Sequence, residues 1–128
     1  MTTDATRPRQ RFSGDGRSLD VHEDGDLEVH TLRGEFDFAV SPTLAELLPA
    51  DPGARRIVLD LREAEYCASS CLQVLLRLSG RLREAGGRPA VVTTVPAVVR
   101  PIELLGLGDV MPLHPSVAAA RASWEEEA

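Results

Sequence analysis

Lysine is absent from this chain of 128 residues, and aromatic residues make up only 4% of it. All fixed positive charge therefore lies on arginine, and leucine, valine and alanine must fill most of the core, since apolar residues make up 43%. The formal net charge is −6 at pH 7. Such a surface repels phosphate backbones, so we expect no nucleic-acid partner.

Long apolar runs are also missing. The first residues, MTTDATRPRQRFSGDGRS, lack the apolar stretch of a signal peptide, and no run approaches the roughly 20 residues that span a bilayer. We therefore expect a cytoplasmic protein with no direct membrane anchor. A chain of this length suits one domain whose core needs neither a disulfide nor a metal.

The distribution of polar residues predicts three segments. Residues 1–17 are polar and contain glycine and proline, which indicates a flexible N-terminal arm. Residues 18–123 form the expected domain. Residues 124–128 contain a run of three glutamates and are expected to be an acidic C-terminal tail.

Strand and helix patterns alternate within the domain. Apolar and polar residues alternate from Leu27, Gly34 breaks the pattern, and Phe36 and Phe38 resume it, which indicates two strands, or one strand with a bulge at Gly34. Ser41 is the expected N-cap of a first helix. Further along, RRIVLDL and PAVVTTV are predicted to be buried strands, and DVMPLH a short last strand. The clearest amphipathic helix runs from Leu72 to Leu82 and is expected to end at Gly86–Gly87. A final helix is expected to be capped by Ser116. This order predicts an α/β domain, with a mixed sheet of about four to five strands and about four helices mainly on one face.

The stretch EYCASSCLQVLL, residues 65–76, joins a central strand to the amphipathic helix. Ser70 and Gln73 have the spacing of a capping box, in which the serine side chain caps the helix. A helix start also carries free N–H groups and a partial positive charge, so it tolerates a phosphate. Local sequence favours the cap, and it leaves a phosphorylation site open because an exposed capping hydroxyl is accessible.

The two cysteines of the chain fall in the same stretch, at Cys67 and Cys71. A zinc site needs about four ligands, and the three histidines are scattered along the chain, so we expect no metal. Cys67 ends a strand and is expected to face the core, where a free cysteine behaves as a small apolar residue. Cys71 begins a helix, a position that lowers a thiol pKa, which makes it the candidate for a thiol sensor.

Four segments resemble a known family when taken in order. They are LRGEFDFAVSPTLAELL, IVLDLREAEYCASSCLQVLL, REAGGRPAVV and IELLGLGDVMPLHPSVAAA. From about Leu27 to Arg121 the chain resembles a STAS domain, in particular the stand-alone bacterial anti-sigma factor antagonists. The resemblance implies a STAS-like single domain that has no catalytic residue, metal or cofactor of its own.

The resemblance also implies a partner and a set of site residues. The partner would be an anti-sigma factor of the histidine-kinase-like ATPase type, which is also a serine kinase. It would phosphorylate Ser70, or with lower expectation Ser69, and phosphorylation would end binding. The unphosphorylated antagonist would occupy the anti-sigma factor and release the sigma factor. The implied partner-binding residues are Asp37, Ser69, Ser70, Cys71 and Gln73.

Three positions depart from the family pattern. Ala68 stands where the family has an aspartate, and Cys71 where it has a glycine. Pro101 interrupts a helix, so we expect that helix to begin after Arg100. These departures leave two alternatives open: a degenerate, unphosphorylated binding or scaffold module, including the STAS subunit of a lipid-transport complex, and a thiol redox or metal-binding protein that uses Cys67 and Cys71.

Overall fold

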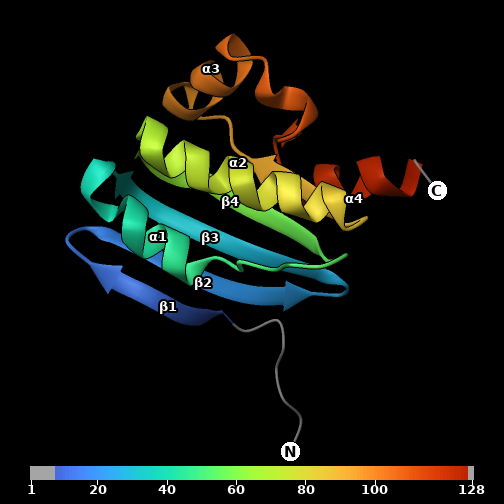
Figure 1. The fold of residues 1–128 in the computed structure, drawn as a ribbon, viewed down its shortest axis with the longest axis horizontal. Coiled ribbons are helices and arrows are strands. Elements are labelled where there is room, and N and C mark those ends of the chain that lie inside the picture. Colours follow the sequence, from blue (N-terminus) through green and yellow to red (C-terminus); the bar gives the residue numbers. More distant parts are fainter. Residues whose placement is uncertain (1–7, 127–128) are drawn as a thin grey trace, which may run out of the picture.

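Residues 8–126, as described by a computed structural model, form one mixed sheet of six strands in the order β1-β2-β3-β4-β5-β6 (Figure 1). The strands are β1 (Arg9–Gly14), β2 (Arg17–Asp24), β3 (Leu27–Phe36), β4 (Arg56–Cys67), β5 (Arg88–Val92) and β6 (Leu113–His114). The helices are α1 (Ser41–Leu47), α2 (Ser69–Glu84), α3 (Pro96–Leu104) and α4 (Val117–Glu126), with short 3-10 turns η1 (Phe38–Val40) and η2 (Leu107–Asp109).

The sheet has an antiparallel part and a parallel part. β1, β2 and β3 pair antiparallel through two tight turns, whereas β3 to β6 pair in parallel. The first turn is the pair Asp15–Gly16, with φ of 54° and 78°, the left-handed backbone that a two-residue hairpin turn favours. The parallel strands require crossovers, which the helices provide.

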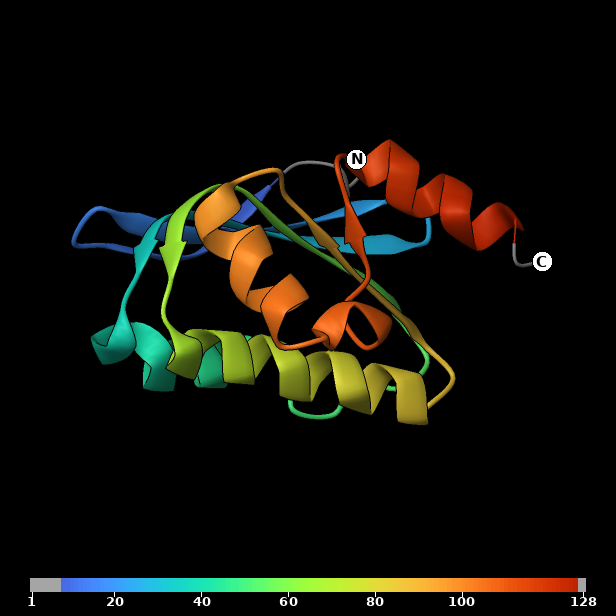
Figure 2. The same ribbon diagram turned by 90° about the horizontal axis from the view of Figure 1, so that it is seen from above.

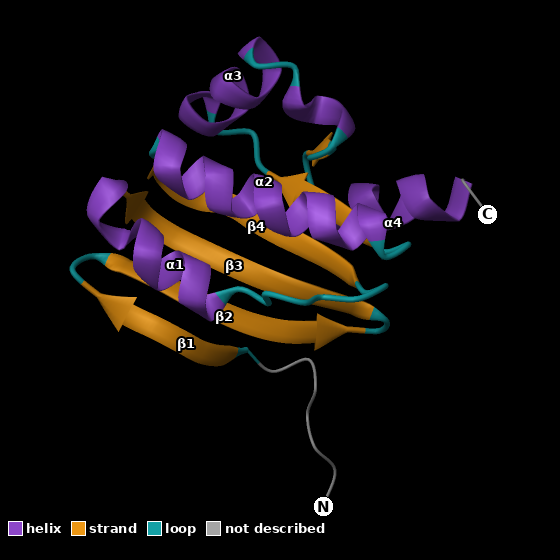
Figure 3. Ribbon diagram, in the orientation of Figure 1, coloured by secondary structure: helices purple, strands orange, loops and turns teal. Residues whose placement is uncertain are grey.

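Three helices cover one face of the sheet, and α4 lies on the opposite face (Figure 2). The larger core cluster lies between the sheet and α1, α2 and α3, and includes Leu32, Phe36, Leu59 and Leu75. A smaller cluster, which includes Trp124, lies under α4. Figure 3 shows α1 and α2 side by side over the strands. The prediction of an α/β domain with about four helices, mainly on one face, is confirmed.

The sheet is larger than the four to five strands expected. The expectation of a loose arm is wrong for residues 9–17, because they form β1, a turn and the first residue of β2. The expected acidic tail is wrong for residues 124–126, because α4 continues through them and Trp124 is buried. Residues 1–7 and 127–128 lie outside the described part of the chain.

Helix and strand boundaries follow the expected signals with two exceptions. β3 is a single strand with an irregular register at Gly34, and Ser116 caps α4 by accepting a hydrogen bond from the Ala119 N–H at 3.0 Å. Ser41, however, is the first residue of α1 rather than its cap. α3 begins at Pro96 and contains Pro101, so it does not start after Arg100. Pro96 occupies the first helical position, which suits its fixed φ.

A partly buried carboxylate near the start of β3, Glu28, makes stability depend on pH. Glu28 accepts a hydrogen bond from His30 at 2.6 Å and one from Arg55 at 3.0 Å. The His30 bond is the largest cause that lowers the pKa of Glu28 from 4.5 to about 2, with Arg55 acting in the same direction and burial opposing. Because the folded pKa is depressed, the stability that Glu28 contributes is present above the unfolded pKa and is lost as pH falls toward the folded pKa.

We expect the free energy of unfolding to fall between pH 4.5 and about pH 2. Urea unfolding at several pH values measures this free energy. Glu28→Gln should reduce the amount of it that is lost as the pH falls. Glu23→Gln, which changes a neighbouring exposed carboxylate, serves as the control. Equal acid-side slopes for both variants and the unmodified protein would contradict the assignment.

Candidate functional site

The carboxyl ends of β3 and β4 meet the first turn of α2 at one corner of the domain (Figure 1). The Ala68 N–H donates to the Phe36 carbonyl at 2.8 Å, which ties the end of β4 to the end of β3. In sheets of this kind, loops at the carboxyl ends of parallel strands carry binding sites. Asp37, Ser69 and Ser70 follow directly after the two strands and therefore share this corner.

The two serines are the first two residues of α2. Ser69 is exposed, whereas Ser70 is half-buried, and its Oγ is shielded from solvent with no hydrogen-bond partner among residues 8–126. The N-cap is Ala68, whose φ of −61° and ψ of 155° are the extended backbone of a cap, and no side chain caps the helix. The predicted capping box of Ser70 and Gln73 is therefore wrong, because Ser70 already lies inside the helix.

Asp37 organises the other side of the corner. Its Oδ1 accepts a hydrogen bond from the Val40 N–H at 3.3 Å and so caps η1, while its Oδ2 lies 3.0 Å from Arg17 Nη2. The Asp37 side chain is 48% exposed and that of Arg17 only 13%. Arg17 also donates to the Glu35 carbonyl at 2.6 Å. Arg17 was not predicted as a site residue, because residues 1–17 were expected to be a flexible arm.

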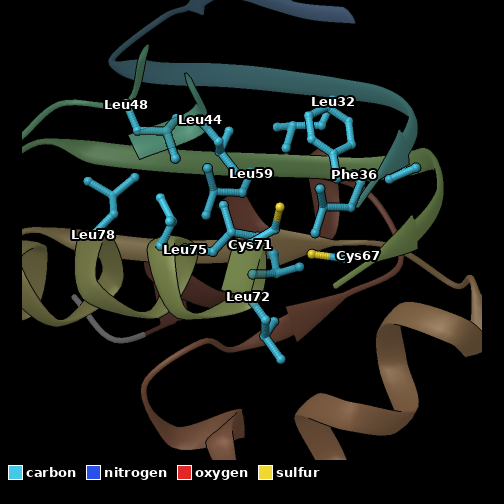
Figure 4. Packing of buried hydrophobic residues seen from close by; sticks show 14 of the residues in the cluster. Leu32, Phe36, Leu44, Leu48, Leu59, Cys67, Cys71, Leu72, Leu75 and Leu78 are labelled. Carbon is cyan, nitrogen blue, oxygen red and sulfur yellow. The ribbon is translucent and has the colours of Figure 1, made fainter. Parts of the chain in front are cut away.

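Cys71 is fully buried and connects α2 to the Asp37 segment (Figure 4). Its Sγ donates to the Asp37 carbonyl at 3.3 Å. Burial raises the pKa of the Cys71 thiol, and the Asp37 carboxylate raises it further. The predicted lowering of this pKa is therefore wrong, and Cys71 is not a surface contact in this structure.

Cys67 shares the environment of Cys71. It is buried as expected, and burial raises the pKa of its thiol to about 12. Within residues 8–126, no three His, Cys, Asp or Glu side chains group in a way that could hold a metal ion. Because the thiolate is the reactive and metal-binding form, both thiols are poorly suited to redox or metal chemistry.

Two aromatic side chains lie exposed at the same corner. Phe38 is 77% exposed directly after Asp37, and Tyr66 is 48% exposed just before Cys67. Phe38 was predicted to be a strand residue, because it continues the alternation of β3, and it was therefore not predicted to be a contact residue. The available sequence signal for Phe38 was the rarity of aromatic residues, since the chain has only three phenylalanines and one tyrosine.

The structure brings most of the expected site residues together. Asp37 and Cys71 are in direct contact, Ser69 and Ser70 precede Cys71 in the same helical turn, and Gln73 is exposed one turn after Ser69. The available surface thus consists of Asp37, Phe38, Ser69 and Gln73. No helix in the described part of the chain is long and apolar enough to cross a bilayer.

Comparison with known proteins agrees with this fold. Residues 19–114 match the family described as "Mlab, STAS domain". The chain is 33% identical over 99 residues to the putative anti-sigma factor antagonist BtrV of Bordetella bronchiseptica, covering 76% of this chain and 85% of BtrV. It is 30% identical over 103 residues to the anti-sigma-F factor antagonist RsfA of Mycobacterium tuberculosis, covering 77% of this chain and 80% of RsfA.

A solved structure gives the same result. The crystal structure of an anti-sigma factor antagonist from Mycobacterium paratuberculosis matches with a TM-score of 0.75 and 28% identity, covering 87% of this chain and 96% of that one. The mixed sheet with a helix start at its carboxyl edge is thus the architecture of a regulatory binding domain. The chain belongs to the STAS domain family, among the anti-sigma factor antagonists.

Proposed function

We propose that this protein is an anti-sigma factor antagonist that binds an anti-sigma factor through the corner formed by the end of β3, η1 and the start of α2. The partner would be of the histidine-kinase-like ATPase type, and its capture would release a sigma factor. The antagonist acts by binding and has no catalytic activity of its own. The observation that carries this proposal is the pair of serines at the start of α2, beside the exposed Phe38, in a chain of this family.

The exposed side chains at the corner suit a protein interface. Interface energy concentrates in a few aromatic and arginine anchors near the centre, and Phe38 is an exposed aromatic residue directly after Asp37. Asp37 is preorganised because Arg17 and the Val40 N–H hold its two carboxylate oxygens. Binding therefore costs little ordering of this side chain.

Phosphorylation of Ser70 is the proposed control of binding. Ser70 is half-buried at the start of α2, so rotation about its Cα–Cβ bond can bring the shielded Oγ to the surface. Ser69, which is exposed, is the second candidate.

The proposal is tested with the anti-sigma factors of this ATPase type from the source genome, each purified and used as a probe. Calorimetry should find one that binds the full chain. Incubation of that complex with ATP and Mg²⁺, followed by mass spectrometry, should place one phosphate on Ser70 and separate the complex. Absence of binding by every probe would overturn the proposed function, whereas binding without phosphate would identify a scaffold module.

Ala68→Asp should raise both helix stability and phosphorylation. Ala68 already has the backbone of an N-cap, so the aspartate carboxylate can accept the free N–H groups of the first turn. We expect about 1 kcal/mol of added stability by urea unfolding and a faster phosphorylation of Ser70 by the cognate kinase. Ala68→Asn, which caps without charge, separates the two effects; an unchanged unfolding midpoint in both variants would contradict the assignment of the cap.

Cys71→Gly, the other change toward the family pattern, should be costly. It removes a fully buried side chain and its bond to the Asp37 carbonyl, and it places glycine inside a helix.

A further inference from the structure

Beyond its first turn, α2 presents a row of exposed side chains that leads away from the serines. Ser69, Gln73, Arg77 and Arg81 follow each other at intervals of four residues, and all four are exposed. Residues at this spacing lie on one side of a helix, about one turn apart. The row therefore runs from the proposed site toward the groove between α2 and α1, which lie next to each other (Figure 1).

A hollow of about 200 Å³ lies in this groove. Leu48 of the α1 end and Val74 and Leu78 of α2 form its apolar wall, and Arg77 and Arg81 stand at its rim. Sites for small molecules occupy roughly 300–1,000 Å³, so the hollow is too small for a nucleotide or cofactor. Its size fits one large apolar side chain.

The arginines at the rim keep their charge available. Arg77 makes no hydrogen bond or ion pair with any residue that the structure describes. Arg81 donates to the Ala50 carbonyl at 3.1 Å, a neutral acceptor that orients its guanidinium without neutralising it. Arginine has five N–H donors, so Arg81 retains donors for a carboxylate.

Many of the other arginines are neutralised within the domain. Ion pairs with carboxylates hold Arg17, Arg33, Arg55, Arg56, Arg62 and Arg121. Arg77 and Arg81 differ from these six, because no carboxylate of the described residues pairs with them. Their positive field attracts an acidic group from outside the molecule.

We propose that the groove between α1 and α2 takes an acidic segment of the anti-sigma factor, with one apolar side chain in the hollow and carboxylates on Arg77 and Arg81. This inference rests on the proposed function and names a second contact of the same partner. Its role is to strengthen and steer binding, and it stands two turns away from the serine that controls release.

The charge of the groove is tested by Arg77→Glu, measured by calorimetry with the cognate anti-sigma factor. We expect binding about tenfold weaker at about 0.05 M salt and a smaller difference at about 0.5 M, because salt screens exposed charges. Arg77→Lys should retain most of the affinity. Arg11→Glu makes the same charge change on β1 and should leave affinity unchanged.

The hollow is tested separately by Ala45→Phe. Ala45 is exposed and lines the hollow, so the added ring fills the space without entering the core. We expect weaker binding with an unchanged unfolding midpoint. Equal affinity of the unmodified protein, Arg77→Glu and Ala45→Phe for the partner would overturn the groove and leave the proposed function intact.

A probe that does not depend on the partner completes the test. A short peptide with one leucine between glutamates should shift the amide NMR signals of residues 45–50 and 74–81, and the same peptide with glutamines should not. Arg77→Glu should abolish the shifts. Equal shifts from both peptides, or no shifts from either, would overturn the proposed groove contact, whether or not an anti-sigma factor is found. Failure to find any anti-sigma factor that binds would instead overturn the proposed function.

Discussion

Phosphorylation of Ser70 is expected to weaken binding to the anti-sigma factor by about a hundredfold to a few thousandfold. A phosphate adds up to about two negative charges, and leaving such a charge buried and unpaired in an interface costs about 3–5 kcal/mol. Each 1.4 kcal/mol corresponds to about a tenfold change in affinity. Ser70 is half-buried and its Oγ is already shielded in the free domain, so a partner on this corner would enclose a phosphate at this position.

The same phosphate should leave the domain folded. Ser70 is the second residue of α2, where the free N–H groups and the helix dipole favour negative charge. Asp37 lies close to this helix start, because its backbone carbonyl accepts a hydrogen bond from Cys71, the residue after Ser70. The Asp37 carboxylate therefore repels the phosphate to some extent. The two effects oppose each other within the domain, whereas the partner would meet only the added charge. The change in affinity should therefore greatly exceed the change in stability.

Calorimetry of the phosphorylated and unphosphorylated chain with the cognate anti-sigma factor measures the loss of binding. Ser70→Glu should reproduce a large part of it. Ser70→Ala should keep the affinity and the stability, because it removes a hydroxyl that has no partner in the described structure. Ser13→Glu adds the same charge at an exposed serine of β1 and serves as the control, with unchanged affinity expected. Affinity within about threefold for the phosphorylated and unphosphorylated chain would contradict the proposed switch.

The sequence predicted the strand–loop–helix unit at the site but not the details of its helix start. The apolar run of β4 and the spacing of Leu72, Leu75 and Leu82 depend on local periodicity, which a sequence shows directly. Which residue caps α2 depends on where the backbone changes from extended to helical dihedral angles. This change follows Ala68, whose N–H still bonds to the Phe36 carbonyl of β3. A capping box starting at Ser70 required a turn two residues later.

The hairpin β1–β2 had a local signal that the sequence analysis did not use. Asp15–Gly16 is a favoured two-residue hairpin turn, and Leu19 and Val21 alternate with polar residues after it. The polar character of the first 17 residues outweighed this pattern. An edge strand such as β1 has one side facing solvent and needs few apolar residues, so composition alone does not distinguish it from a loose arm.

The burial of Cys71 had a local signal that was not used, because Cys71, Leu75, Leu78 and Leu82 follow each other at helical spacing and all are buried. The bond from its thiol to the Asp37 carbonyl, 34 residues earlier in the chain, had none. The same long-range geometry raises a pKa that a helix start would lower. Contacts between distant segments therefore decide the chemistry of this site, and they become visible only when β3 and β4 are placed side by side.

Gly34→Ala is expected to destabilise the domain by about 3 kcal/mol or more. A residue with a side chain at this position has both the cost of left-handed backbone and the cost of overpacking, and the two costs add. Gly34 has a φ of +94°, and an added Cβ would lie 2.1 Å from the Gly16 carbonyl oxygen and 3.0 Å from Arg17 Cα. Both neighbours are backbone atoms, so neither can turn aside. The hairpin turn must move away from β3, where the strand register is already irregular.

This displacement should also reach the site. Arg17 follows the turn and holds both Asp37 and the Glu35 carbonyl, so moving it loosens η1. Thermal unfolding should show a midpoint lower by roughly 10 °C, with weaker binding to the anti-sigma factor at temperatures where the variant is folded. Gly80→Ala is the matched control, because an added Cβ there meets nothing within 4 Å. As alanine favours the interior of α2 by about 1 kcal/mol, that variant should be more stable than the unmodified protein, and equal midpoints for the two glycine variants would refute the close contact at Gly34.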